Sequence, residues 1–185
     1  QAASLIALMN ILQAGDHLVA SSTIYGGTFN LYGVTLKRYG IECTFVDQEL
    51  PLEELQKAIR PNTKAVFGET IANPAITVLD IEKFATLAHR NGVPLIVDNT
   101  FATPILCRPF EFGADIVTHS TTKYMDGHAV QIGGVIVDSG KFDWKNGKFP
   151  GLTEPDETYH GVVYVRDFGK TAYITKARVQ LMRDL

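Results

Sequence analysis

Apolar residues recur along the chain at two spacings, and the two spacings alternate. Compact apolar runs, typical of buried strands, fall at residues 17–21, 41–46, 64–69, 93–97, within 112–119, and at 132–137. Apolar residues recur at helical spacing at residues 5–12, 28–39, 52–59, 81–90 and 170–185. Strands that alternate with helices at short intervals predict an α/β fold, with a doubly wound, mainly parallel sheet and helices on both faces.

Glycine and capping residues indicate where the predicted helices begin and end. Gly15 is expected to end the first helix as a C-cap, and Thr28 could cap the second, which would stop at Gly40. Asp80 is a good N-cap for the helix at 81–90, and Asn91-Gly92 would end that helix.

Residues 141–169 form a long segment rich in proline, glycine and aromatic residues, and its pattern predicts an irregular loop. No internal repeat or linker divides the chain, so residues 1–185 are predicted to form one domain. The chain begins at Gln1 inside one helical pattern, without an initiator Met, and stops at Leu185 inside another. This pattern predicts an internal piece of a longer protein.

Composition and charge narrow the class of protein. The 185 residues are 45% hydrophobic and 20% charged, as in globular proteins, and the net charge of −3 argues against nucleic acid or an anionic membrane as partner. No apolar run has the length of a membrane span, and the printed sequence shows no signal-peptide pattern. Cys43 and Cys107 are expected to be reduced and packed, which predicts a cytoplasmic protein. His119 and His128 have no partner at metal-ligand spacing, so no metal site is expected.

A lysine follows a strand and a run of hydroxyl residues in the stretch Asp115–His128. The strand ends in Ser120, Thr121 and Thr122, and Lys123 comes next. Such a lysine suits a Schiff base beside an anchored phosphate. Taken alone, the stretch is more often a surface lysine in a Ser/Thr loop.

Other polar residues change that balance, because ligands of open α/β sheets bind beyond the carboxyl ends of the strands. Glu69 and Asp98 also fall at strand ends. The set suits pyridoxal 5'-phosphate: the lysine amine would form the imine, and an Asp98 carboxylate would keep the pyridine nitrogen protonated. Ser120 and Thr122 alternate around Thr121, so both hydroxyls could point toward the phosphate. Tyr25 could stack its ring on the pyridine.

Four motifs follow one another along most of the chain: Tyr25-Gly26-Gly27-Thr28-Phe29, Glu69-Thr70-Ile71-Ala72-Asn73-Pro74, Asp98-Asn99-Thr100-Phe101 and Ser120-Thr121-Thr122-Lys123-Tyr124 with Gly127-His128. Together they resemble the cysteine and methionine metabolism family of pyridoxal-phosphate enzymes of fold type I. The resemblance implies that the chain is the large cofactor-binding domain, without the family's N-terminal arm and C-terminal domain. Ala129 departs mildly from the family pattern, which usually has Ser, Gly, Asn or His at this place.

The resemblance also implies a role for each motif residue. Lys123 would hold the cofactor covalently and move protons, Asp98 would pair with the pyridine nitrogen, and Tyr25 would stack on the ring and act as acid or base. Ser120 and Thr122 would hold the phosphate.

Three further residues receive roles from the same resemblance. Asn73 would lie near the cofactor and the substrate carboxylate, with Glu69 in support. Gln1 would follow a Ser-Gly pair whose amides help bind the phosphate.

Three segments, 155–161, 166–169 and 176–185, resemble the O-acetylhomoserine sulfhydrylase branch of the family, and Gly27 agrees. This implies γ-replacement on O-acetylhomoserine by sulfide or a thiol, giving homocysteine or methionine plus acetate. Cystathionine γ-synthase, a methionine or cystathionine γ-lyase, or a catalytically inactive fragment remain alternatives. The family implies a homotetramer built from dimers. Lys176 and Arg178 are expected on a solvated helix face or at a subunit contact.

Overall fold

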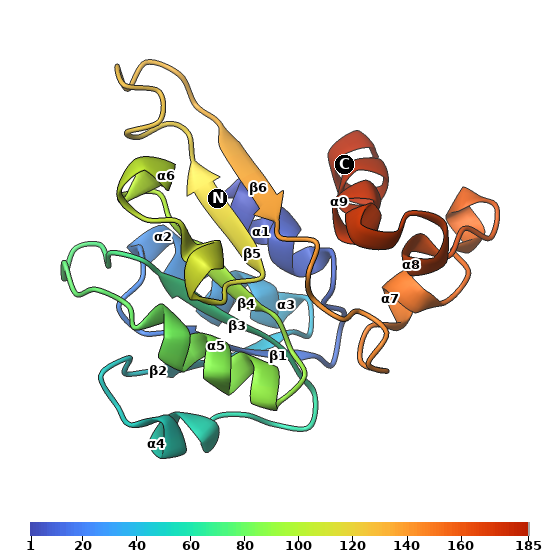
Figure 1. Cartoon of the computed structure of the whole chain (residues 1–185), viewed down its shortest axis with the longest axis horizontal. Coiled ribbons are helices and arrows are strands. Elements are labelled where there is room, and N and C mark those ends of the chain that lie inside the picture. Colours follow the sequence, from blue (N-terminus) through green and yellow to red (C-terminus); the bar gives the residue numbers. More distant parts are fainter. Residues whose placement is uncertain (185) are drawn as a thin grey trace.

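A six-stranded sheet in the order β2-β1-β3-β4-β5-β6 organises the computed structural model, which describes residues 1–184 (Figure 1). The strands are β1 His17–Ser21, β2 Glu42–Val46, β3 Thr63–Glu69, β4 Leu95–Asp98, β5 Ile116–Ser120 and β6 Gly134–Asp138. β1 pairs in parallel with β2 and β3, and the pairs β3–β4 and β4–β5 are also parallel. Only the edge strand β6 is antiparallel to its neighbour. The predicted mainly parallel α/β sheet is therefore confirmed.

Helices cover both faces of the sheet (Figure 1). The regular helices are α1 Ala2–Met9, α2 Gly26–Asn30, α3 Leu36–Arg38, α4 Leu52–Gln56, α5 Ile81–Arg90, α6 Thr103–Leu106, α7 Pro150–Thr153, α8 Tyr164–Asp167 and α9 Ala172–Lys176. π-Helical turns at Leu31–Thr35 and Ala177–Arg183 extend α2 into α3 and prolong α9, and 3-10 turns lie at Pro109–Phe112, Glu157–Tyr159 and Gly169–Thr171. No helix within residues 1–184 is long and apolar enough to cross a membrane.

Two hydrophobic clusters hold these layers together, one on each face of the sheet. On one face, Phe84 and Leu87 of α5 pack with Val66, Leu95 and Val97. On the other face, α1 and the helix that follows β1 pack over the alternate strand positions; the cluster there includes Leu8, Tyr32, Phe67, Ile96 and Ile116. Because side chains of a strand alternate between faces, this division assigns each strand-end residue to one side.

Two elements begin and end at the residues that the sequence predicted. The strand at His17–Ser21 and the helix at Ile81–Arg90 are both confirmed. Asp80 caps α5 because its Oδ1 accepts a hydrogen bond from the Lys83 amide at 2.9 Å. Asn91 and Gly92 end the helix, and Gly92 adopts a left-handed φ of 63°.

Two predicted helix boundaries are wrong. α1 ends at Met9, and Gly15 lies in a later turn with φ 91°, where its amide donates to the Gly40 carbonyl at 2.8 Å. Thr28 lies inside α2, whose N-cap is Tyr25. For Gly15, the bond that its turn makes to Gly40 overrides the local capping preference.

The segment at 141–169 is not a single irregular loop, because it contains α7 and α8. Its start packs against α9 through a buried aromatic group in which Trp144 stacks on Tyr173 at 5.2 Å between ring centroids. The predicted helix at 170–185 is confirmed in its central part, where α9 continues into the π-helical turn; Leu185 lies outside the described residues.

His17 bridges three strands at the amino end of the sheet. Its Nδ1 lies 2.8 Å from the Thr63 hydroxyl, and its Nε2 lies 2.8 Å from the Thr44 hydroxyl. Burial, helped by the charge of Arg60, lowers the pKa of His17 from 6.5 to about 4. The imidazole is therefore neutral in the folded protein at neutral pH.

The depressed pKa of His17 predicts a loss of stability in mild acid. Because the unfolded chain binds the proton more tightly, the stability is present above pH 6.5 and is lost as pH falls toward 4. The slope from this group is up to about 1.4 kcal/mol per pH unit. Urea unfolding at several pH values should show that His17→Gln lacks this component. An equal slope in the variant and the wild type would contradict the assignment.

Candidate active site

The ends of three neighbouring strands bring polar side chains to one edge of the sheet. In the parallel register, Glu69 of β3 lies beside Asp98 of β4, and Asp98 lies beside Thr118 of β5. Residues two positions earlier on these strands belong to the same hydrophobic cluster: Phe67, Ile96 and Ile116. Glu69, Asp98 and Thr118 therefore point to the same face of the sheet.

The Asp98 carboxyl is held from one side only. Its Oδ1 accepts hydrogen bonds from the Thr100 amide at 3.0 Å and from the Thr100 hydroxyl. The Thr100 hydroxyl also accepts from the Ser120 amide at 2.8 Å, so it joins the ends of β4 and β5. Burial raises the pKa of Asp98, although the bonds from Thr100 oppose the shift. A cation placed against Asp98 would favour its ionised form.

Glu69 is the second carboxyl group at this edge and is almost fully buried, with 7% of its surface exposed. Its Oε1 accepts a hydrogen bond from the Tyr25 amide at 2.8 Å. Burial raises the pKa of Glu69 to about 8, and the neighbouring Asp98 charge raises it as well. A negative charge on Asp98 therefore makes it harder for Glu69 to ionise.

Tyr25 and Gln1 converge on a glycine at the start of α2. Tyr25 is the N-cap residue, and 49% of its surface is exposed. A Cβ atom on Gly27 would lie 2.4 Å from Gln1 Nε2 and 2.6 Å from Tyr25 Cε1. The Thr28 hydroxyl donates to Gln1 Oε1 at 3.5 Å. Glycine at position 27 therefore allows Gln1 and Tyr25 to lie side by side.

The lysine loop leaves the sheet earlier than the alternation of hydroxyl residues suggests. β5 ends at Ser120, and the chain turns from Thr121 onward, so Ser120 and Thr122 do not alternate along a strand. The Thr122 hydroxyl instead donates to the Gly133 carbonyl at 3.3 Å and accepts from the Gly133 amide at 3.1 Å. Lys123 is exposed, and its amide donates to the Ser120 carbonyl at 3.4 Å.

Three other residues complete the description of this edge. Asn73 is half-buried and forms a cis peptide bond with Pro74. Ala129, in the lysine loop, adopts a φ of 54°, in the region that favours glycine. Gly127 has a φ of 80°, which glycine adopts without cost.

Sequence reasoning missed Thr100, Thr118 and Tyr32. The backbone bond of Thr100 could have been found, because an aspartate side chain commonly accepts a hydrogen bond from the amide two residues further on. Thr118 and Tyr32 lie in apolar patterns and carried no signal. Their hydroxyl oxygens are buried and have no hydrogen-bond partner within residues 1–184.

The groups at this edge fit pyridoxal 5'-phosphate. Asp98 offers a carboxyl group whose Oδ2 accepts no hydrogen bond within the described part of the chain, which suits a cationic ring nitrogen. The exposed ring of Tyr25 suits the pyridine ring, and the exposed amine of Lys123 suits the aldehyde. The Ser120 hydroxyl suits the phosphate, whereas the Thr122 hydroxyl could donate to it only by giving up its bond to the Gly133 carbonyl. In contrast, no group of three or more His, Cys, Asp or Glu residues within 1–184 could hold a metal ion.

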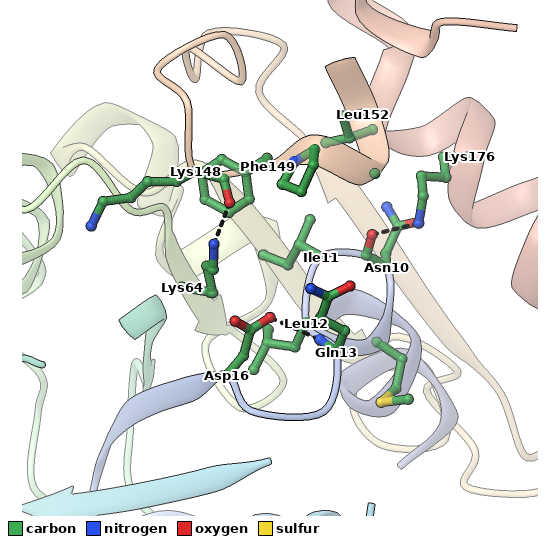
Figure 2. Close-up of a pocket in the computed structure, with 13 residues that line it drawn as sticks. Asn10, Ile11, Leu12, Gln13, Asp16, Lys64, Lys148, Phe149, Leu152 and Lys176 are labelled. Atoms are coloured by element: carbon green, nitrogen blue, oxygen red, sulfur yellow. Dashed lines mark hydrogen bonds between the residues drawn. The ribbon is translucent and has the colours of Figure 1, made fainter. Parts of the chain in front are cut away.

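A separate hollow of about 170 Å³ lies away from this edge (Figure 2). Asp16, just before β1, and Lys64, near the start of β3, contribute to its lining, so it belongs to the amino end of the sheet. Lys176 enters it from α9 and donates to the Asn10 carbonyl at 2.7 Å (Figure 2). Lys176 is only 9% exposed, so the predicted solvated face is wrong for this residue, whereas Arg178 is exposed.

Burial lowers the pKa of Lys176 to about 8, which predicts a gain of stability in mild alkali. The unfolded chain keeps this proton up to pH 10.5, so stability should rise between pH 8 and pH 10.5, by up to about 1.4 kcal/mol per pH unit. Lys176→Met should remove this rise, and Lys170→Met, at an exposed position, should retain it. The free energy of unfolding, measured across this pH range, tests the assignment. A rise in Lys176→Met as large as in the wild type would refute it.

Comparison with known proteins gives the same family along most of the chain. The family model described as "Cys/Met metabolism PLP-dependent enzyme" matches residues 1–164. The chain is 48% identical to the homocysteine/cysteine synthase of Saccharomyces cerevisiae, over 100% of this chain and 42% of the relative. It is 51% identical to the O-acetyl-L-homoserine sulfhydrylase of Corynebacterium glutamicum, over 100% of this chain and 43% of the relative. The chain thus spans less than half the length of these curated relatives.

A solved structure from Campylobacter jejuni shares the fold, with a TM-score of 0.87 and 37% sequence identity. The match covers 96% of this chain and 45% of the other protein, which carries N'-pyridoxyl-lysine-5'-monophosphate. A lysine joined to the pyridoxal group is therefore present in a close structural neighbour.

Proposed function

Because the chain belongs to the Cys/Met metabolism family of PLP-dependent enzymes, we propose that residues 1–185 form the cofactor-binding large domain of an O-acetylhomoserine sulfhydrylase. The enzyme would replace the acetate of O-acetylhomoserine with sulfide or a thiol such as methanethiol. The carrying observation is the strand-end cluster around Asp98, in a chain 51% identical to a sulfhydrylase. The names of the relatives, a homocysteine/cysteine synthase and an O-acetyl-L-homoserine sulfhydrylase, support this replacement over the cystathionine γ-synthase and γ-lyase alternatives.

When bound, pyridoxal 5'-phosphate supplies an aldehyde that captures an amino group and a ring that withdraws electrons from the adjacent carbon atoms. Lys123 would bind the aldehyde, and Asp98 would pair with the ring nitrogen. Ser120, Thr122 and Gln1 would lie around the phosphate. Tyr25 would cover the ring, and Asn73 would lie toward the substrate carboxylate.

Asp98 would stabilise positive charge on the ring nitrogen. Thr100 fixes one carboxyl oxygen and leaves the other free to accept a hydrogen bond. Because burial disfavours an isolated charge at Asp98, the carboxylate and a facing cation stabilise one another.

Lys123 would move protons once the substrate amine has displaced it. Its loop leaves the sheet directly after Ser120 and includes Gly127, so the amine is carried by a turn next to the strand ends. A neutral amine there can take a proton from the substrate carbon and return it later in the cycle. The Tyr25 hydroxyl is the second candidate acid or base on the chain.

A homotetramer built from dimers remains part of the proposal. Large apolar side chains are exposed near the same edge, including Ile132 at 97%, Ile105 at 88% and Val130 at 77%. Surfaces of this kind are typical of protein contacts. The amino-acid substrate and the sulfide or thiol are the proposed small-molecule partners.

Lys123→Ala is expected to abolish covalent attachment of the cofactor. The test reduces the loaded protein, at its natural length, with borohydride and locates the label by peptide mass spectrometry. The wild type should carry a pyridoxyl group on Lys123, and Lys123→Ala should carry none. A label on another lysine, or one that persists in the variant, would overturn the assignment.

Asp98→Ala is expected to lose far more turnover than cofactor affinity. Removing the charge that stabilises the protonated ring should lower kcat by about 100-fold or more. The cofactor would keep its covalent and phosphate contacts, so its Kd should change much less. Asp143→Ala, at an exposed position, is the control. Turnover in Asp98→Ala equal to that of the control would rule out the role.

A further inference from the structure

Glu69 lies beside Asp98 but has no assigned part in holding the cofactor. The two residues are partners in the β3–β4 register, and their side chains share one face of the sheet. Two ionised carboxylates this close in a buried site repel each other. The site therefore favours one charge, and the ring nitrogen requires it on Asp98.

Glu69 contacts the main chain of the residue proposed to cover the ring. Its Oε1 accepts the Tyr25 amide at 2.8 Å, and Tyr25 begins α2 with no side-chain cap of its own. The bond therefore ties the carboxyl end of β3 to the start of α2. Since Glu69 is 7% exposed, water cannot readily replace it as the acceptor.

The surroundings of Glu69 supply no compensating cation. Within residues 1–184, no lysine, arginine or histidine forms an ion pair with it. The titratable groups around it are Asp98 on β4 and the buried Tyr32, whose pKa is raised by burial and then by the nearby Asp98, Cys43 and Glu69. The Asn73 amide also faces the carboxyl and favours its charge, as the Tyr25 amide does. Burial outweighs these bonds and raises the pKa of Glu69 to about 8.

We propose that Glu69 is a positioning residue that fixes Tyr25 through its main chain as an uncharged carboxylic acid, and so leaves the single negative charge of the pair on Asp98. The carbonyl oxygen of the acid accepts the Tyr25 amide, and the hydroxyl oxygen keeps the proton. The inference rests on the proposed function for the placement of Tyr25 over the cofactor. It adds a residue that acts through Tyr25 and does not touch the reacting atoms.

Two substitutions of Glu69 test whether the Tyr25 amide needs a charged acceptor or only a neutral one. Glu69→Gln keeps a neutral carbonyl oxygen at the same reach, whereas Glu69→Leu removes the acceptor and leaves the Tyr25 amide without it. Loss of such a bond exposes the Tyr25 amide about tenfold more often. Hydrogen exchange at the Tyr25 amide should therefore accelerate about tenfold in Glu69→Leu and return toward the wild-type rate in Glu69→Gln. Glu49→Leu, at an exposed position, is the control.

The proton itself is measured on the cofactor-free protein at its natural length, labelled with ¹³C at the glutamate carboxyl carbon. The Glu69 signal, identified by its loss in Glu69→Gln, should titrate near pH 8. A transition below pH 5 would overturn the proposal, as would exchange in Glu69→Gln as fast as in Glu69→Leu.

Cofactor affinity links the inference to the proposed function. The Kd for pyridoxal 5'-phosphate should rise about tenfold in Glu69→Leu and be rescued in Glu69→Gln. Equal losses in the two variants would show that a charge is needed and would refute the inference. If the wild type takes up no cofactor, the proposed function fails, while the exchange and carboxyl measurements still decide the state of Glu69.

Discussion

The parallel register of β3, β4 and β5 is the constraint on which the candidate site depends. Neighbouring strands lie about 4.8 Å apart. The register therefore holds Glu69, Asp98 and Thr118 side by side, whatever the loops beyond them do. Thr100 adds a second tie between β4 and β5 through the Ser120 amide. The strand register thus fixes the positions of Glu69 and Asp98, and the segments after β5 and β1 carry Lys123 and Tyr25.

Much of the fold could be predicted because its signals are local. The helix at Ile81–Arg90 has a capping aspartate, a regular apolar face and a terminal Asn-Gly, and all of these agree. Gly15 and Lys176 show where local signals fail. Gly15 serves a turn that bonds to Gly40, and Lys176 is buried against Asn10, so tertiary contacts distant in sequence decide both.

Some features of the candidate site could likewise be predicted from the sequence, and others could not. The order of strand ends followed from the α/β pattern, so Glu69, Asp98 and Ser120 could be placed at one edge from the sequence. The protonation of the carboxyl pair could not be predicted, because it depends on burial and on the exact neighbours of each group. The sequence named the Thr122 hydroxyl as a phosphate ligand but could not predict its hydrogen bonds to Gly133, because these depend on β5 ending two residues before it.

A crystal structure of the protein at its natural length, grown with pyridoxal 5'-phosphate, tests the central claim most directly. The account predicts continuous density between Lys123 Nζ and the cofactor, with the ring nitrogen within hydrogen-bond distance of Asp98 and the ring beneath Tyr25. Cofactor density at another lysine, such as Lys176 in the separate hollow, or a ring nitrogen with no contact to Asp98, would contradict it.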